Sequence, residues 1–128
     1  MAMPLMVETV TGILDVQIDT GPEGRFIYET KYASPDIAFN DAKRVGRISD
    51  YGTFDLHFMT DFKLAVPAIG FPLGQPRNVS WEQRDASFTV TIDVPYEGVQ
   101  FPQVVEFLVH RDDGAISDPT ILVDPPHA

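Results

Sequence analysis

The chain contains no cysteine among its 128 residues. Without a thiol, a disulfide, a thiolate nucleophile, an iron–sulfur cluster and a cysteine-ligated zinc site are all excluded. The sequence also lacks the glycine spacings that hold nucleotide phosphates and the Gly-x-Ser-x-Gly context of an activated serine. Redox, phosphoryl-transfer and covalent acyl-transfer functions are therefore disfavoured, and we expect no cofactor.

Basic residues are scarce, because nine Lys and Arg stand against nineteen Asp and Glu and give a net charge of -10. A field of this sign repels phosphate backbones and anionic lipid surfaces. We therefore expect no nucleic acid partner and no membrane partner. The acidic residues are spread along the chain without a block, which is typical of a solvated surface, and a cationic partner remains an alternative.

Long apolar runs are also lacking. The longest weakly polar stretch, residues 64–73, has about ten residues interrupted by proline and glycine, whereas a membrane-spanning helix needs about 20. The N-terminus has no basic region ahead of an apolar one, so we expect no signal peptide. These features predict a cytoplasmic protein with one β domain over residues 1–128 and flexible ends at about 1–6 and 125–128.

Apolar residues that recur at every second position are the main pattern in the sequence. Eleven prolines and nine glycines divide the chain into short pieces, and the period of two within them is that of a β-strand. Residues 14–19 and 26–32 predict a hairpin around 21–24, and residues 87–94 form the clearest half-buried strand. We predict an all-β domain of about seven or eight mostly antiparallel strands.

The strongest alternation lies in residues 53–66. A three-residue hairpin loop at 59–61 would preserve the pattern, but it contains no Gly or Asn for the left-handed position of such a loop. One long, bent strand is therefore favoured, and long strands are more usual in barrels than in small sandwiches. We predict an antiparallel β-barrel, with a β-sandwich as the alternative. The apolar residues at even positions are Phe54, Leu56, Phe58, Phe62, Leu64 and Val66.

One segment, residues 35–45, carries helix signals instead. Ser34 is a good N-cap, Pro35 occupies the first helical position, and Gly46 follows as a C-terminal signal. Apolar residues within the segment recur at helical spacing. These signals predict one short helix near 35–45.

His57 and Asp55 are the candidates for acid–base chemistry. Both belong to the odd-numbered face of the 53–66 pattern, where a carboxylate could orient an imidazole and raise its pKa. The alternative is that these residues form the solvated face of an amphipathic strand.

A short loop, residues 112–118, contains several acidic and hydroxyl oxygens of the kind that calcium prefers. The loop lacks the spacing of an EF-hand, and a polar hairpin turn explains the same residues. The histidines show no metal-ligand spacing, so no metal site is predicted.

Aromatic residues are abundant and supply the candidates for ligand binding. The phenol and indole groups of Tyr and Trp can make directed hydrogen bonds in an otherwise apolar pocket. The alternative is that these side chains fill the core. The ligand-binding candidates are Tyr28, Tyr32, Phe58, Phe71 and Trp81.

Two function hypotheses follow. The first is a small-molecule-binding β-barrel that carries an apolar ligand, or that acts as a cofactor-free cyclase or isomerase through the shape of its pocket. The alternative is a non-catalytic interaction or assembly module of the immunoglobulin-like β-sandwich type. Under either hypothesis, exposed strand edges would allow a homodimer. An internal apolar cavity supports the first hypothesis, whereas a filled core with an exposed apolar patch supports the second.

Overall fold

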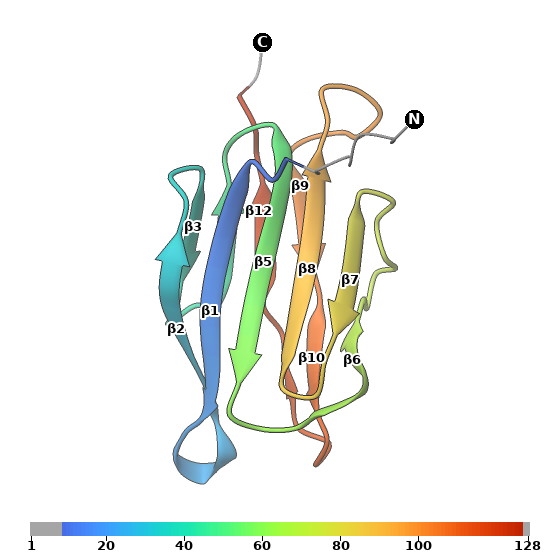
Figure 1. Ribbon diagram of the computed structural model, residues 1–128. Helices are drawn as coiled ribbons and strands as arrows, with labels where there is room; N and C mark the ends of the chain where they lie inside the picture. The colour runs from blue at the N-terminus through green and yellow to red at the C-terminus, as the bar shows by residue number, and fades with distance from the viewer. Residues whose placement is uncertain (1–8, 127–128) are drawn as a thin grey trace, which may run out of the picture.

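The computed structural model describes residues 9–126, which form an all-β fold as the sequence predicts. It contains twelve strands and one short 3₁₀ turn, Pro22–Gly24. Figure 1 shows the largest sheet in front, with strands of the smaller sheets behind it. Within these described residues, no helix is long and apolar enough to cross a lipid bilayer.

The largest sheet consists of β1 (Gly12–Thr20), β2 (Phe26–Ala33), β5 (Gly52–Thr60), β7 (Val79–Gln83) and β8 (Ser87–Val94). Their order is β2-β1-β5-β8-β7. The pair β1–β5 is parallel and the other neighbours are antiparallel. We call this the five-stranded sheet.

Two smaller sheets complete the fold. The four-stranded sheet has the order β3-β4-β12-β9 and contains a parallel pair, β4–β12. The three-stranded sheet has the order β11-β10-β6. Among residues 9–126, no sheet closes on itself into a barrel. The bounds are β3 (Ile37–Asn40), β4 (Val45–Ile48), β6 (Leu64–Gly70), β9 (Gln103–Glu106), β10 (Leu108–Arg111), β11 (Ile116–Ser117) and β12 (Thr120–Val123).

The predicted hairpin is confirmed, because β1 and β2 pair antiparallel across the 3₁₀ turn. The turn is tight: Gly21 N–H donates to the Arg25 carbonyl at 2.6 Å, and both Glu23 and Gly24 have positive φ. The alternating residues of β1 and β8 turn their apolar side chains inward, as the period of two predicts. Local sequence therefore determines these strands.

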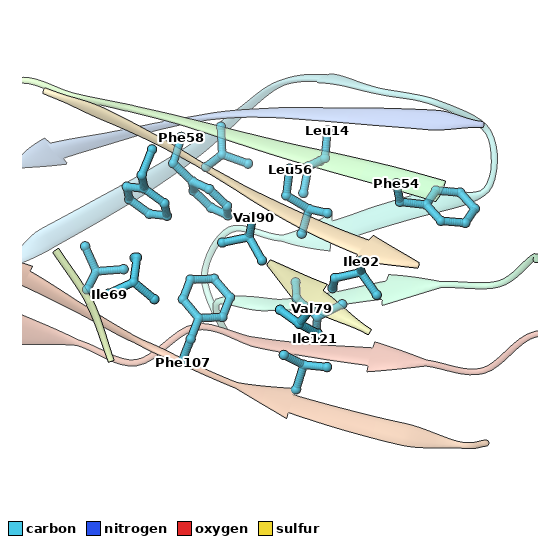
Figure 2. Close-up of a cluster of buried hydrophobic side chains, with 14 of the residues drawn as sticks. Leu14, Phe54, Leu56, Phe58, Ile69, Val79, Val90, Ile92, Phe107 and Ile121 are labelled. Atoms are coloured by element: carbon cyan, nitrogen blue, oxygen red, sulfur yellow. The ribbon is translucent and has the colours of Figure 1, made fainter. Parts of the chain in front are cut away.

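The core is built mainly from large apolar side chains of the five-stranded sheet and the strands behind it. Figure 2 shows side chains such as Leu56, Phe58 and Val90 meeting Phe107 and Ile121 from the opposite side. All five of these residues are at most 1% exposed. Burying each such side chain contributes about 1.5–3 kcal/mol, so this cluster is the main source of stability.

The predicted helix near 35–45 is wrong, because this segment forms the hairpin β3–β4. Ser34 does not cap a helix; its carbonyl accepts the Ile37 N–H at 3.1 Å and its hydroxyl accepts the Ile13 N–H at 2.9 Å. Residue Arg44, with φ of 56°, completes the turn. Pairing of β4 with the distant β12 outweighs the local helix signals, which carry no information on such a partner.

The predicted long strand over 53–66 is also wrong. The chain leaves β5 at Thr60 and re-enters regular structure as β6 in a different sheet. The bend keeps the parity, because Leu64 is buried like Phe58, but Val66 is 89% exposed on β6. The alternation of apolar residues across 53–66 therefore does not reveal that the chain passes from one sheet to another.

The structure has more strands than the predicted seven or eight, because several segments are divided into shorter strands. Besides the split into β5 and β6 and the hairpin in place of the helix, Phe107 separates two short strands, β9 and β10. At the C-terminal end Pro125 is buried, and the Tyr51 hydroxyl donates to the Pro126 carbonyl at 2.9 Å. The segments 1–6 and 127–128, which the sequence predicts to be flexible, lie outside the described residues.

Candidate binding site

Three of the five predicted ligand-binding residues belong to one aromatic cluster in the core. The Tyr28 ring stacks on Phe39 at 5.9 Å between centroids, and Phe39 meets Phe58 edge-on at 6.4 Å. Phe58 and Phe71 both contact the ring of Phe107, at 6.0 and 6.4 Å. The cluster packs the interior, so these rings face one another.

The polar tip of Tyr28 has a partner inside the protein. Its hydroxyl and that of Ser117, on β11, lie 2.7 Å apart, and both residues are buried. Desolvation raises the pKa of Tyr28 to about 12, against a smaller opposing effect of the hydrogen bond with Ser117. The bond joins the five-stranded and three-stranded sheets, which is a structural role.

The other two candidates lie apart from this cluster. Tyr32 is 55% exposed near the end of β2. Trp81 is half-buried on β7, the edge strand of the five-stranded sheet, and packs against the core from its rim. The five candidates therefore do not share one site.

His57 and Asp55 lie in a polar groove of about 470 Å³ on the outer face of the five-stranded sheet. Outward side chains of β5, β7 and β8 line it, and all are hydroxyl, carboxylate or imidazole groups. Thr91 Oγ1 donates to Asp55 Oδ1 at 2.9 Å, and Thr89 Oγ1 lies 3.3 Å from His57 Nδ1. Each candidate is thus oriented by a threonine of the neighbouring strand.

The acidic loop, which the sequence analysis interprets as a polar turn, contains the β10–β11 turn. Asp113 Oδ1 accepts hydrogen bonds from Arg111 Nε at 2.9 Å and from Ala115 N at 3.0 Å. The bond from Arg111 holds the pKa of Asp113 below its ordinary value. In the part of the chain that the structure describes, no three His, Asp or Glu side chains are grouped so as to hold a metal ion.

A larger hollow, of about 590 Å³, lies at the end of the five-stranded sheet and opens to solvent. We call it the end pocket. Its walls come from the beginning of β5, the end of β8, the residues just before β7 and the β8–β9 loop (top of Figure 1). Apolar surface dominates these walls, and Pro95, Tyr96 and Val99 contribute its main apolar side chains.

Hydrogen bonds fix the position of the β8–β9 loop beside β7. Arg77 Nη2 donates to the Gly98 carbonyl at 3.1 Å and so bridges two walls of the end pocket. Asn78 Nδ2 donates to the Asp93 carbonyl at 3.0 Å and to Gln103 Oε1 at 2.9 Å. These contacts join loop, β8 and β9 at one corner.

Aromatic stacking fixes the same loop from another side. Tyr96 stacks on Tyr51 with centroids 4.4 Å apart, and Tyr51 in turn meets Phe101 edge-on at 6.5 Å. Tyr96 is nevertheless 83% exposed. Its ring is therefore held in place while most of its surface stays open to a ligand.

The end pocket and the polar groove share a border. Thr53 and Asp93 line both, and Thr53 Oγ1 donates to Asp93 Oδ1 at 2.9 Å. An apolar hollow is thus continuous with a row of polar side chains that includes Asp55 and His57. This arrangement suits a molecule with both apolar and polar parts.

Sequence reasoning missed the end pocket. Its walls lie in connecting segments around Arg77 and Tyr96, where no apolar period exists to reveal which side chains converge. The one available signal was the turn composition of residues 95–98, which includes an aromatic residue. Comparison with models of known protein families finds no match, and comparison with curated proteins finds none either.

Proposed function

We propose that this domain binds a small, partly apolar molecule in the end pocket. The observation that carries the proposal is an apolar hollow of about 590 Å³ bordered by a few polar groups. Natural ligand pockets have volumes of about 300–1,000 Å³ and combine apolar walls with a small number of polar contacts. The hydrogen bond from Arg77 to the β8–β9 loop and the stacking of Tyr96 on Tyr51 support a site that is already formed before the ligand binds.

This proposal keeps the small-molecule ligand expected from the sequence but moves its site. The expected site was the interior of a barrel, and the interior is occupied by the aromatic cluster around Phe58. The end pocket is open on one side, which suits reversible binding. A cyclase or isomerase that works by shape alone needs its substrate to be held on all sides in a reactive geometry, so the open pocket favours binding over catalysis.

Binding in the end pocket can be tested with isotope-labelled protein. A library of small apolar fragments would be screened by amide NMR spectra, and native mass spectrometry of the purified protein would detect a ligand that copurifies. We expect the shifted amides to cluster at residues 96–99. Fragments that shift the aromatic cluster instead, with no effect on the loop, would contradict the proposal.

A pair of matched variants sharpens the test. Val99→Phe adds volume inside the end pocket and should abolish fragment binding, because packed sites tolerate extra volume poorly. Val104→Phe makes the same change on β9, where Val104 is 56% exposed and lines no wall of the pocket, and should leave binding unchanged.

A second candidate function is an interaction or assembly module of β-sandwich type, and we propose a homodimer as its simplest form. The supporting observation is an apolar hollow of about 420 Å³ on the outer face of β4 and β12. Val45 and Val104 are 42% and 56% exposed on this face, and Leu122 lies between Arg47 and Val104 in the strand register. Exposed apolar patches of this kind often mark contacts between proteins.

Light scattering coupled to size exclusion would test this second candidate. A dimer should become a monomer in Val104→Glu, since a charge would then enter the contact. Val66→Glu is the control, because Val66 is 89% exposed on β6, away from this face. A wild-type protein that is monomeric at all concentrations would exclude the homodimer.

A further inference from the structure

Three charged side chains line the end pocket: Arg77, Asp93 and Glu97. Arg77 reaches it from the segment before β7, and Glu97 from the β8–β9 loop. Among residues 9–126, neither forms an ion pair. The hydrogen bond of Arg77 to the Gly98 carbonyl uses one N–H of a guanidinium that has five. Most of the binding capacity of both charges is therefore uncommitted.

The remaining polar groups of the end pocket form hydrogen bonds within the protein. The Asp93 carboxylate accepts the Thr53 hydroxyl, and the Asn78 amide is bonded to Gln103 and to the Asp93 carbonyl. A ligand in the pocket would thus meet apolar walls, the Arg77 cation, the Glu97 carboxylate and the Asp93 carboxylate, whose Oδ1 accepts the Thr53 hydroxyl.

We infer that the ligand of the end pocket is a small zwitterion with an apolar body, of the class of apolar dipeptides. Its carboxylate binds Arg77, whose planar fork matches two carboxylate oxygens, and its ammonium group binds Glu97. The apolar side chains lie against Pro95, Tyr96 and Val99. This inference rests on the proposed function and adds the chemical class of the ligand.

The overall charge of the protein makes the inference selective. A net charge of -10 attracts any cation to the surface and repels any anion. Specific recognition therefore means that the affinity depends on both charges of the ligand at once. A ligand that keeps only its ammonium group is the most stringent competitor.

The test uses one dipeptide, L-leucyl-L-phenylalanine, in four forms that share the same apolar body. These are the free dipeptide, its N-acetyl derivative, its C-terminal amide and the doubly blocked form. Affinities would be measured by titration of the wild-type protein at low ionic strength, with amide NMR shifts locating the site. We expect the free dipeptide to bind best and each single block to weaken binding by about three- to tenfold.

Two variants assign the charges to residues. Arg77→Gln should make the free dipeptide bind no better than its amide, and Glu97→Gln should make it bind no better than its N-acetyl derivative. Arg84→Gln and Glu106→Gln alter exposed residues that line no wall of the end pocket and should preserve the preference for the free dipeptide. Unchanged NMR spectra away from the loop would show that both test variants fold, which matters because Arg77 also holds Gly98.

Other outcomes overturn the inference. If the doubly blocked dipeptide binds as well as the free form, the pocket does not recognise charge, although the proposed binding function stands. If the amide binds as well as the free form, Arg77 has no role in selection. If none of the four forms binds, the ligand class is wrong, and the fragment screen of the wild-type protein decides separately whether the end pocket binds small molecules.

Discussion

Asn78 and Gln103 hold each other through two side-chain hydrogen bonds. Asn78 Nδ2 donates to Gln103 Oε1, and Gln103 Nε2 donates to Asn78 Oδ1, each at 2.9 Å. Asn78 lines the end pocket directly before β7, and Gln103 is the first residue of β9. This pair therefore ties the five-stranded sheet to the four-stranded sheet at the candidate site.

Removing either partner of this pair should weaken both stability and binding. We expect Gln103→Ala to lower the free energy of unfolding by about 1 kcal/mol, because Asn78 loses two hydrogen bonds in a partly buried place. A double-mutant cycle with Asn78→Ala, measured by urea unfolding, should give a coupling of about 0.5 kcal/mol or more. Gln100→Ala is the exposed control. Strictly additive effects would show that the pair contributes nothing.

Phe58→Ala should be among the most damaging core substitutions. Phe58 is 1% exposed and stacks on Phe88 with centroids 4.7 Å apart, so truncation leaves a cavity in the aromatic cluster. We expect a loss of about 3–5 kcal/mol in chemical denaturation. The neighbouring Met59 is 57% exposed, and Met59→Ala should change stability by about 0.5 kcal/mol or less. A small effect at Phe58 would mean that this ring lines a space able to collapse.

Stability should fall at high pH because of Tyr28. Burial raises the pKa of this phenol to about 12, above its ordinary value of 10.0, so the folded protein retains the proton where the unfolded chain loses it. The contribution of Tyr28 is complete below pH 10 and is lost as the pH rises towards about 12, an effect of about 2–3 kcal/mol.

Comparing two tyrosine variants isolates this effect. Tyr28→Phe should flatten the decline in unfolding free energy between pH 10 and 12, although it also loses the bond to Ser117. Tyr32→Phe alters a ring that is 55% exposed and should keep the slope of the wild type. Equal slopes in all three proteins would contradict a buried Tyr28.

Arg111→Lys should destabilise the end of the fold opposite the candidate pocket. The guanidinium lies 4.8 Å from the centre of the Phe26 ring and 5.6 Å from that of Phe62, and it also donates to the Gly24 carbonyl at 3.1 Å. Lysine has neither the planar stacking surface nor the fork of donors. We expect a loss of about 1–3 kcal/mol in unfolding experiments, with Arg84→Lys as the exposed control.

The same variant has a second readout at Asp113. Arg111 donates to this carboxylate at 2.9 Å and lowers its pKa, so the pair stabilises the fold above the ordinary carboxyl pKa and less as the pH falls. In Arg111→Lys the pKa of Asp113 should move back up towards its usual range, which carbon-detected NMR titration would measure. An unchanged pKa would assign the shift to the Ala115 N–H instead.

Those parts of the fold that depend on local alternation could be predicted from the sequence. The hairpin β1–β2 and the half-buried strand β8 follow directly from apolar residues at every second position. The same rule failed at residues 53–66, because the bend after Thr60 preserves parity while the chain moves from one sheet to another. The period of two shows which side chains of a strand face inward, but it does not show to which sheet the strand belongs.

The helix predicted near 35–45 shows a different limit. Its N-terminal signal at Ser34 is real, but the Ser34 hydroxyl serves another purpose and accepts the Ile13 N–H of β1 at 2.9 Å. The partner that stabilises β4 is β12, far along the chain. Local propensities of a few tenths of a kcal/mol per residue are easily outweighed by such pairing.

The candidate site was the least predictable part. Asp55 and His57 were correctly placed on one outward face by parity, as the polar groove shows. The end pocket depends on contacts between connecting segments, such as Arg77 with Gly98 and Tyr96 with Tyr51. Such contacts depend on where the sheets bring the loops, which no short-range pattern encodes.

The parallel pairing of β4 with β12 has a consequence for how the chain reaches this structure. Val45 pairs with Thr120 and Ile48 with Val123, so one edge of β4 stays unpaired until β12 is available. During synthesis, the hairpin β3–β4 can form early, but its sheet cannot assemble until residues 120–123 have emerged. Closing such long loops before gaining contacts slows folding, and all-β proteins of this kind refold in about milliseconds to seconds.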